Sequence, residues 1–267
     1  MAEDLGRGPA IVLRRYPLGE SDRMVIMLTR SWGKVRAVAK GMRRSRKRGL
    51  SSLDVLSLAQ VELTKTKRGR GWRISAGKVI DPFWPLAKDP VGLAMAFCFT
   101  ETIDRMVGVD HPVPEIFDLL NWALGALSRG GGENVLRMAE VKLLDLSGLL
   151  PPLDRCPKCG NDPLGRGADK GARFSFTAQA AYCGRCAGSN ATNPTLSDGT
   201  LRTLRQIAGQ PVERLSRLSL TRTSVDELGA IMPKLIEYHL GDRIKSRRVL
   251  SQLLPNRPAK ARGAAGP

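Results

Sequence analysis

The chain has 267 residues, with 43 lysines and arginines against 25 aspartates and glutamates, and a formal net charge of +18 at neutral pH. This length is enough for two domains that each bury a hydrophobic core. The longest apolar run, residues 91–99, is far too short to cross a bilayer, and the acidic residues that follow Met1 are not typical of a secretory signal. We therefore expect a soluble, cytoplasmic protein.

The positive charge is concentrated near the N-terminus. Residues 1–80 hold 19 basic and 6 acidic side chains, an excess of 13, whereas the rest of the chain has an excess of only 5. This asymmetry favours a polyanionic partner for the N-terminal part, most simply a nucleic acid. An anionic membrane is the alternative, but membranes usually recruit an amphipathic basic helix, and this part of the sequence has the pattern of strands.

The first 80 residues show the alternation and the glycine-rich turns of an all-β domain. In one segment Val35, Ala37 and Ala39 share a face, and charged residues occupy the other face. Five short cationic strands predict a small closed barrel of the OB type, although an SH3-like barrel would give a similar pattern. The strands are expected at residues 11–13, 24–29, 34–40, 54–65 and 72–79.

Beyond the barrel the hydrophobic period becomes helical. Pro90 suits the first turn of a helix, Ser197 is expected to cap a later one, and Ser224 with Glu227 has the spacing of a capping box. Cys98 lies in an apolar helical stretch and is expected to be buried. Helices are expected at residues 90–107, 115–129, 133–147, 197–208, from 224 onward, and at 243–253.

Two pairs of cysteines interrupt the helical region. Cys156 and Cys159 are separated by two residues, as are Cys183 and Cys186, and 23 residues lie between the pairs. Two such pairs are typical of a zinc ion with four thiolate ligands, a closed site with a structural role. Two disulfides or four free thiols are the alternatives, but nothing in the sequence indicates an oxidising compartment. We predict one structural zinc ion per chain.

These patterns together predict an α+β, multidomain chain. We expect a five-stranded OB-fold β-barrel at residues 1–82 and an α-helical domain at residues 83–254. A four-cysteine zinc module at residues 155–190 is inserted into the helical domain. The tail, residues 255–267, offers no apolar content to bury and is expected to be disordered.

The cations of the barrel are the candidate nucleic-acid contacts, because clustered lysines and arginines neutralise phosphates. With few aromatic residues beside them, we expect a grip on the backbone with little reading of sequence. Trp32 and Trp72 could stack on bases, but barrel tryptophans more often lie in the core or at the rim. The candidates are Lys34, Arg36, Lys40, Arg43, Arg44, Arg46, Lys47, Arg48, Lys67, Arg68 and Arg70.

Three blocks of sequence carry a resemblance to a known family. They are Gly19-Glu20-Ser21-Asp22 with Gly33-Lys34, then Leu146–Pro152 followed by Cys156-Pro157-Lys158-Cys159-Gly160, and finally Tyr238-His239-Leu240-Gly241 through Lys245-Ser246-Arg247-Arg248. In these blocks, and in the order of its parts, the chain resembles the bacterial recombination mediator RecO over nearly its whole length apart from the tail.

The resemblance implies a nucleoid-associated protein of DNA repair and recombination after DNA damage. It implies binding to single- and double-stranded DNA, annealing of complementary strands and cooperation with RecR. It further implies the replacement of single-stranded DNA-binding protein by RecA. A cationic and apolar set near the C-terminus would suit the acidic tail of single-stranded DNA-binding protein, although a solvated last helix explains it equally well. That set comprises Arg243, Lys245, Arg247, Arg248, Val249, Leu250 and Leu253.

No pattern in the sequence predicts catalysis. The segment Arg129–Glu133 lacks the Gly-Lys-Ser/Thr ending of a phosphate loop, no acidic cluster suits Mg²⁺, and neither His111 nor His239 pairs with a nucleophile. We therefore expect that the protein is not an enzyme. Two alternatives to the mediator remain. One is a zinc-ribbon OB-fold protein that binds RNA or acts in transcription, and the other is a DNA-processing enzyme.

Overall fold

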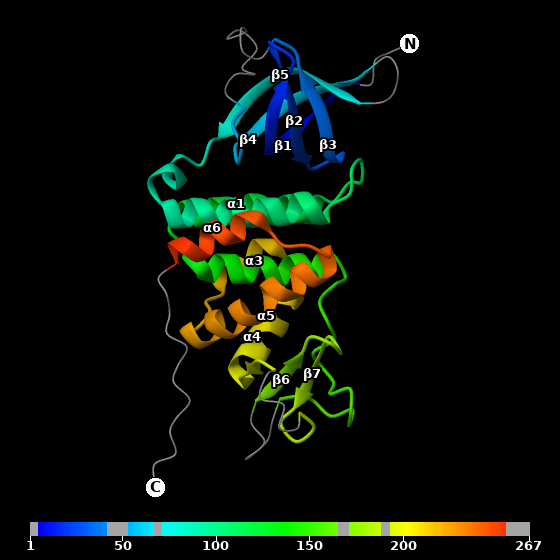
Figure 1. The fold of residues 1–267 in the computed structure, drawn as a ribbon. Helices are drawn as coiled ribbons and strands as arrows, with labels where there is room; N and C mark the ends of the chain where they lie inside the picture. Colours follow the sequence, from blue (N-terminus) through cyan, green and yellow to red (C-terminus); the bar gives the residue numbers. More distant parts are fainter. Residues whose placement is uncertain (1–4, 42–52, 67–70, 165–170, 188–192, 255–267) are drawn as a thin grey trace.

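The structure is a computed structural model of the chain, and it describes residues 5–41, 53–66, 71–164, 171–187 and 193–254. A β-barrel lies at one end, helices fill the middle, and a small β-module lies at the other end (Figure 1). The predicted α+β architecture is confirmed: a five-stranded OB-type barrel precedes a helical domain that carries the four cysteines. Within the described ranges, no helix combines the length and the apolar character needed to span a membrane.

The barrel closes in the order β1-β2-β3-β5-β4, with β4 returning to β1. Its pairs are antiparallel except β3 with β5. Val35, Ala37 and Ala39 are fully buried, so the alternating pattern identified the inner face of β3 correctly. The strands are β1 (Leu5–Leu18), β2 (Asp22–Thr29), β3 (Gly33–Ala39), β4 (Leu58–Lys65) and β5 (Trp72–Asp81).

Strand β1 is much longer than the sequence indicated. It pairs with β4 only as far as Ile11, but it continues beside β2 to Leu18 as an edge segment, called here the β1 ribbon, while β2 also pairs with β3. A bulge between Val12 and Arg14 separates the two stretches. The ribbon is exposed, so it lacks the apolar alternation by which strands are recognised in a sequence.

The helical domain is built around α3. All ten residues from Val135 to Leu144 are buried, because neighbouring helices cover α3 on every side. Short 3-10 helices, η2 (Trp84–Lys88) and η4 (Val212–Arg217), join the longer elements. The helices are α1 (Pro90–Met106), α2 (Pro114–Ser128), α3 (Gly132–Leu146), α4 (Asp198–Gly209), α5 (Arg222–Leu240) and α6 (Lys245–Leu253).

The start of α5 differs from the prediction. The hydroxyl of Thr221 caps the helix by accepting from the backbone N–H of Ser224 at 3.1 Å, so the predicted capping box at Ser224 is wrong. Glu227 supports the neighbouring helix instead, because its carboxylate accepts from the N–H of Ser197 at 2.9 Å. Ser197 is the cap of α4, as predicted.

The barrel is fixed to the helical domain at the β2–β3 turn. Gly33 has a φ of +67°, and a Cβ at this position would lie 1.7 Å from the carbonyl oxygen of His111. The backbone N–H of Asp110 donates to the carbonyl of Lys34 at 2.9 Å. The guanidinium of Arg30 makes two hydrogen bonds of 3.0 Å to the carboxylate of Asp118 on α2. The contact therefore combines close backbone packing with a bidentate ion pair.

Candidate metal centre and nucleic-acid interface

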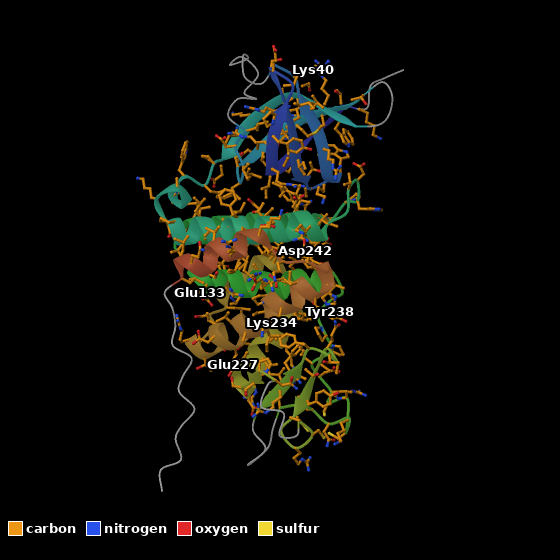
Figure 2. The ribbon with its side chains drawn as sticks, viewed as in Figure 1. Lys40, Glu133, Glu227, Lys234, Tyr238 and Asp242 are labelled. Carbon is orange, nitrogen blue, oxygen red and sulfur yellow. The ribbon has the colours of Figure 1, made fainter. Side chains whose placement is uncertain are left out.

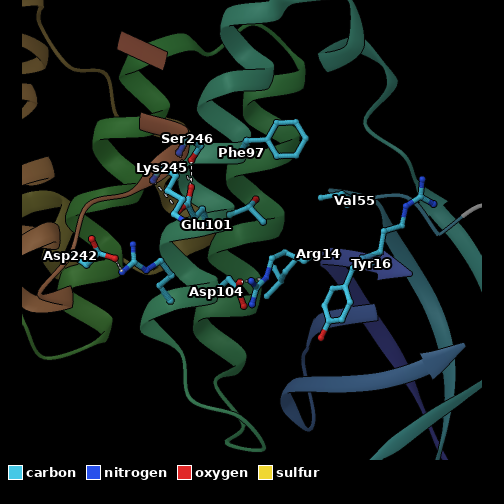
Figure 3. A pocket seen from close by; sticks show the side chains of 13 residues that line it. Arg14, Tyr16, Val55, Phe97, Glu101, Asp104, Asp242, Lys245 and Ser246 are labelled. Atoms are coloured by element: carbon cyan, nitrogen blue, oxygen red, sulfur yellow. Dashed lines mark hydrogen bonds and ion pairs between the residues drawn. The ribbon is translucent and has the colours of Figure 1, made fainter. Parts of the chain in front are cut away.

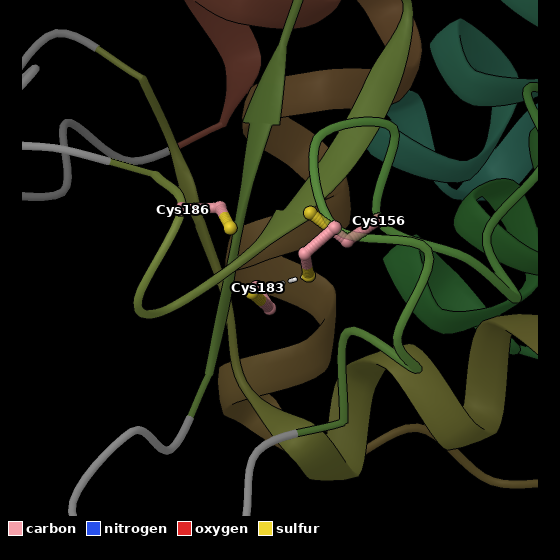
Figure 4. A group of neighbouring side chains, drawn as sticks. Cys156, Cys183 and Cys186 are labelled. Atoms are coloured by element: carbon pink, nitrogen blue, oxygen red, sulfur yellow. Dashed lines mark hydrogen bonds between the residues drawn. The ribbon is translucent and has the colours of Figure 1, made fainter.

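The four cysteines meet at one point, although the two pairs are far apart in sequence. Their Sγ atoms all lie within 4.8 Å of one another, and those of Cys159 and Cys183 are 3.7 Å apart (Figure 4). Each pair sits in the same kind of turn. The N–H of Gly160 donates to the carbonyl of Cys156 at 2.8 Å, and the N–H of Ala187 donates to that of Cys183 at 2.9 Å. The fold thus aims four sulfur atoms at a common centre.

This geometry suits a tetrahedral metal ion. Zinc–sulfur bonds of about 2.3 Å place neighbouring sulfurs about 3.8 Å apart, close to the 3.7 Å between Cys159 and Cys183. A disulfide would need a separation of about 2.05 Å. The spacing of the sulfur atoms is therefore that of metal ligands and not that of bonded cysteines.

The pKa shifts of the cysteines are also consistent with metal binding. Burial opposes ionisation of Cys156, but N–H groups of Cys183, Cys159 and Lys158 outweigh it and lower the pKa of that thiol to about 6. Hydrogen bonds with Cys159 and Cys183 raise the pKa of Cys186 to about 12. One thiolate therefore forms readily, while further negative charge needs a cation to balance it. The cluster can bind a metal ion.

The cysteine cluster is anchored to the helices beneath it. Cys183 ends one strand of a three-stranded sheet in the order β7-β6-β8, formed by β6 (Ala172–Ser175), β7 (Ala180–Cys183) and β8 (Thr195–Leu196). The sheet packs into the main core through the buried ring of Phe174. Arg205 of α4 donates to the carbonyl of Leu153 at 3.1 Å and to the carboxylate of Asp162 at 2.6 Å. The module is therefore part of the helical domain's packing.

Lys34 does not belong to an exposed charged face, contrary to the expectation from alternation. Only 8% of it is exposed, because α1 covers this end of β3. Its ammonium donates to the backbone carbonyl of Asp104 and pairs with the Asp104 carboxylate at 3.5 Å. Burial lowers the pKa of Lys34, and the charge of Asp104 opposes that shift. Lys34 therefore fixes the barrel to α1 and does not reach a phosphate.

Two of the predicted cations are exposed farther along β3. Arg36 and Lys40 are exposed, and Lys40 lies at the end of the barrel away from the helices (Figure 2). Arg73 of β5 is exposed beside them, because its register partner in the parallel β3–β5 pair is Val38. The sequence alone does not identify Arg73, because only the β3–β5 pairing places it beside Arg36 and Lys40. We call Arg36, Lys40 and Arg73 the β3–β5 face.

The other predicted cations fall outside the described residues. They are Arg43, Arg44, Arg46, Lys47, Arg48, Lys67, Arg68 and Arg70. By chain order the first five follow β3 and the last three join β4 to β5. Their role in nucleic-acid binding stays a prediction.

Trp32 and Trp72 lie together at the rim of the barrel. Their ring centroids are 6.0 Å apart, and both rings pack against the barrel core. The indole N–H of Trp72 donates to Asp110 at 3.2 Å, and the ammonium of Lys65 lies 5.4 Å from the centre of its ring. Both indoles are partly buried, and that of Trp72 is placed to hold the barrel against the residue 108–111 loop.

The C-terminal cationic set is divided by the fold. Arg247 points into the helical domain, where its guanidinium donates to Glu140 at 2.8 Å. Glu140 is 1% exposed and also accepts from Arg137 at 2.5 Å. Arg247 is therefore a core residue and not part of a docking surface. Cys98 is buried nearby, as predicted, and burial raises the pKa of its thiol to about 11.

Comparison with known proteins assigns the family. The model "Recombination protein O N terminal" matches residues 1–83, and "Recombination protein O C terminal" matches residues 87–248. The chain belongs to the RecO family. "DNA repair protein RecO" of Anaeromyxobacter dehalogenans is 32% identical over 246 residues, which cover 92% of this chain and 95% of that relative. The resemblance noted in the sequence is thereby confirmed.

RecO relatives from more distant bacteria align over a similar length. The protein of Syntrophobacter fumaroxidans is 30% identical over 247 residues, covering 92% of this chain and 97% of its own. The protein of Moorella thermoacetica is 28% identical over 249 residues, covering 93% and 91%. The similarity to RecO therefore includes the barrel, the helices and the cysteine module together.

Proposed function

We propose that this RecO-family chain is a DNA-binding recombination mediator in recombinational DNA repair. It anneals complementary strands and helps RecA to load on single-stranded DNA that is coated with single-stranded DNA-binding protein. Its partners are single- and double-stranded DNA, RecR, single-stranded DNA-binding protein and, indirectly, RecA. Membership of the RecO family supports the broad role in DNA repair and recombination.

The observation that favours strand binding is the charge of the barrel surface. The β3–β5 face presents three exposed cations on adjacent strands, within a segment that carries an excess of 13 basic side chains. Two strands that anneal must first overcome the repulsion between their phosphates, and cations on a protein surface reduce it. This mechanism needs binding and no bond cleavage, so we propose a protein without catalytic residues.

We further propose that the cysteine cluster binds one zinc ion through Cys156, Cys159, Cys183 and Cys186. Four thiolates complete the tetrahedral coordination of zinc and leave no position for water or substrate. The ion would then hold the two cysteine turns together. Its contribution is to the stability of the module, as expected for a closed site.

An annealing assay tests the proposal. Two complementary oligonucleotides are coated with single-stranded DNA-binding protein and mixed with and without this chain. The proposal predicts that the chain accelerates duplex formation and that RNA of the same sequence competes weakly. Preference for RNA would instead favour a zinc-ribbon RNA-binding protein. Strand cleavage that depends on Mg²⁺ would indicate a DNA-processing enzyme.

A further inference from the structure

A cleft of about 680 Å³ lies between the barrel and the helical domain (Figure 3). Residues Leu13–Tyr16 of the β1 ribbon form one wall, and α1 with the start of α6 forms the other. Its volume lies within the range of about 300–1,000 Å³ of sites for small ligands. The cleft shares no residue with the β3–β5 face, so it requires an explanation of its own.

The acidic groups of the cleft are already neutralised by the protein. Glu101 accepts from the N–H groups of Lys245 and Ser246 at 2.9 and 2.8 Å, and so caps the start of α6. Burial opposes ionisation of Glu101, but the hydrogen bond from the Ser246 hydroxyl at 2.6 Å and those from the two N–H groups outweigh it, so the pKa of Glu101 is lowered. The carboxylate of Asp104 pairs with Arg14 at 2.6 Å. Asp242 accepts from Arg105 at 2.8 Å.

Three cations at the mouth of the cleft stay exposed to solvent. The side chain of Arg14 is 59% exposed in spite of its pair with Asp104, and that of Arg15 is 38% exposed in spite of its pair with Asp54 at 2.5 Å. Lys245 is exposed on the opposite wall. A ligand that contacts both walls would therefore meet positive charge on each side, which favours an anion.

Each wall also presents an aromatic ring. Tyr16 on the ribbon is 44% exposed, and Phe97 on α1 is 39% exposed. Both line the cleft, and Figure 3 shows them on opposite sides of it. Aromatic rings beside cations are the means by which proteins hold single-stranded nucleic acid, because the rings stack on bases and the cations contact phosphates.

We propose that the cleft holds one or two nucleotides of a single DNA strand, with bases against Tyr16 and Phe97 and phosphates near Arg14, Arg15 and Lys245. This inference rests on the proposed function, and it adds a strand-binding site that the barrel and the helical domain share. A base must be unpaired to stack on a side chain, so the cleft selects single strands over duplex.

The ribbon wall disfavours a peptide as the occupant. Among the described residues, β1 beyond Val12 has backbone partners only on β2, which leaves a strand edge beside the cleft. An added peptide strand would need backbone donors along that edge, but Pro17 lacks an N–H. A nucleotide does not depend on a regular row of backbone donors, and its phosphate fits the exposed cations of both walls.

The test uses the full chain and fluorescence anisotropy with an oligothymidylate and a duplex of equal length. The double variant Tyr16→Leu with Phe97→Leu should bind the oligothymidylate about tenfold more weakly, since stacking of each base contributes severalfold in affinity. Duplex affinity and the salt dependence of binding should not change, because no charge is removed. Tyr238→Leu on α5, an exposed tyrosine outside the cleft, is the matched control.

A charge variant tests the same cleft independently. Lys245→Gln should reduce the slope of log affinity against log salt by about 0.7 for single strands, and Lys234→Gln on α5 should not change it. Ultraviolet cross-linking with a bromouracil-substituted oligonucleotide should label Tyr16 or Phe97. This measurement does not depend on how well a variant folds.

Three outcomes would overturn the proposal. One is an unchanged affinity of the double aromatic variant for the oligothymidylate, with no cross-link at either ring. Another is an equal loss for single strand and duplex. A third is a double aromatic variant that loses binding to an acidic aromatic peptide but keeps its affinity for the oligothymidylate, which would make the cleft a peptide site. Failure of the unaltered chain to bind any oligonucleotide would reject the proposed function itself, and the cleft site with it.

Discussion

Two glycines show how a single position fixes the barrel to the helical domain. Gly33 and Gly41 have similar φ values, +67° and +63°, but only Gly33 lies against another segment. Gly41→Ala should cost about 1–2 kcal/mol, because alanine is strained in the left-handed region. Gly33→Ala should cost about 1–3 kcal/mol more, because its Cβ would overlap the carbonyl of His111. Urea denaturation measures the free energy of unfolding of each variant. Equal losses for Gly33→Ala and Gly41→Ala would show that the contact of Gly33 with His111 does not constrain this position.

Adjacent arginines of α6 provide a second comparison. Arg247→Met removes one of the two cations that bind the buried carboxylate of Glu140. Because Arg137 still compensates that carboxylate, the cost should lie at or below the lower end of the about 3–5 kcal/mol expected for an uncompensated buried charge. Arg248 is exposed, so Arg248→Met should change the free energy of unfolding by less than about 0.5 kcal/mol. Thermal and urea denaturation distinguish the two. Similar stability of both variants would show that the buried pair contributes nothing.

These residues show what the sequence could not reveal. The sequence does not distinguish Lys34 and Arg247 from the exposed cations beside them, because charge and spacing do not reveal a partner that is distant in sequence. Lys34 pairs with Asp104 and Arg247 pairs with Glu140, and each of these carboxylates belongs to another element of the fold. Arg73 was missed for the same reason, since it joins Arg36 and Lys40 only through the β3–β5 pairing.

At the scale of elements, the cysteine module is the part that depends most on an added ligand. Elemental analysis should find about one zinc ion per chain, as four ligands for each ion require. Removal of the metal, or Cys156→Ser, should lower the melting temperature while DNA affinity changes little, because the barrel is a separate element. Cys98→Ala, which removes a thiol outside the cluster, is the control and should keep about one zinc ion per chain. Metal-free protein of undiminished stability would contradict the assignment.

Elements with one buried face were predictable, and elements without one were not. The inner residues of β3 and the start of α1 follow from hydrophobic period and from Pro90. The ribbon of residues 14–18 has no buried face and was not recognised as a strand. The four cysteines could be recognised as candidate metal ligands from the sequence alone, because the two-residue spacing within each pair is a local feature.

At the scale of the whole molecule, the barrel and the helical domain form one nucleic-acid surface in this account. We propose that the β3–β5 face provides phosphate contacts and that the interdomain cleft provides stacking. The contacts of Gly33, Lys34 and Arg30 hold the two parts in register. A strand that crosses both would be held along its length without reading of its sequence, as annealing requires.

The salt dependence of strand binding is the sharpest test of whether the barrel binds DNA through the β3–β5 face. A triple variant with Arg36, Lys40 and Arg73 each changed to Gln is compared with a charge-matched control on the helical domain, Arg217, Arg222 and Lys234 each changed to Gln. The account predicts that the first variant lowers the slope of log affinity against log salt by up to about 2 for single strands, and that annealing slows with it. The control should keep the slope and the annealing rate of the unaltered chain. A β3–β5 variant that retained both, or a control that lost as much, would contradict the claim that the barrel grips DNA.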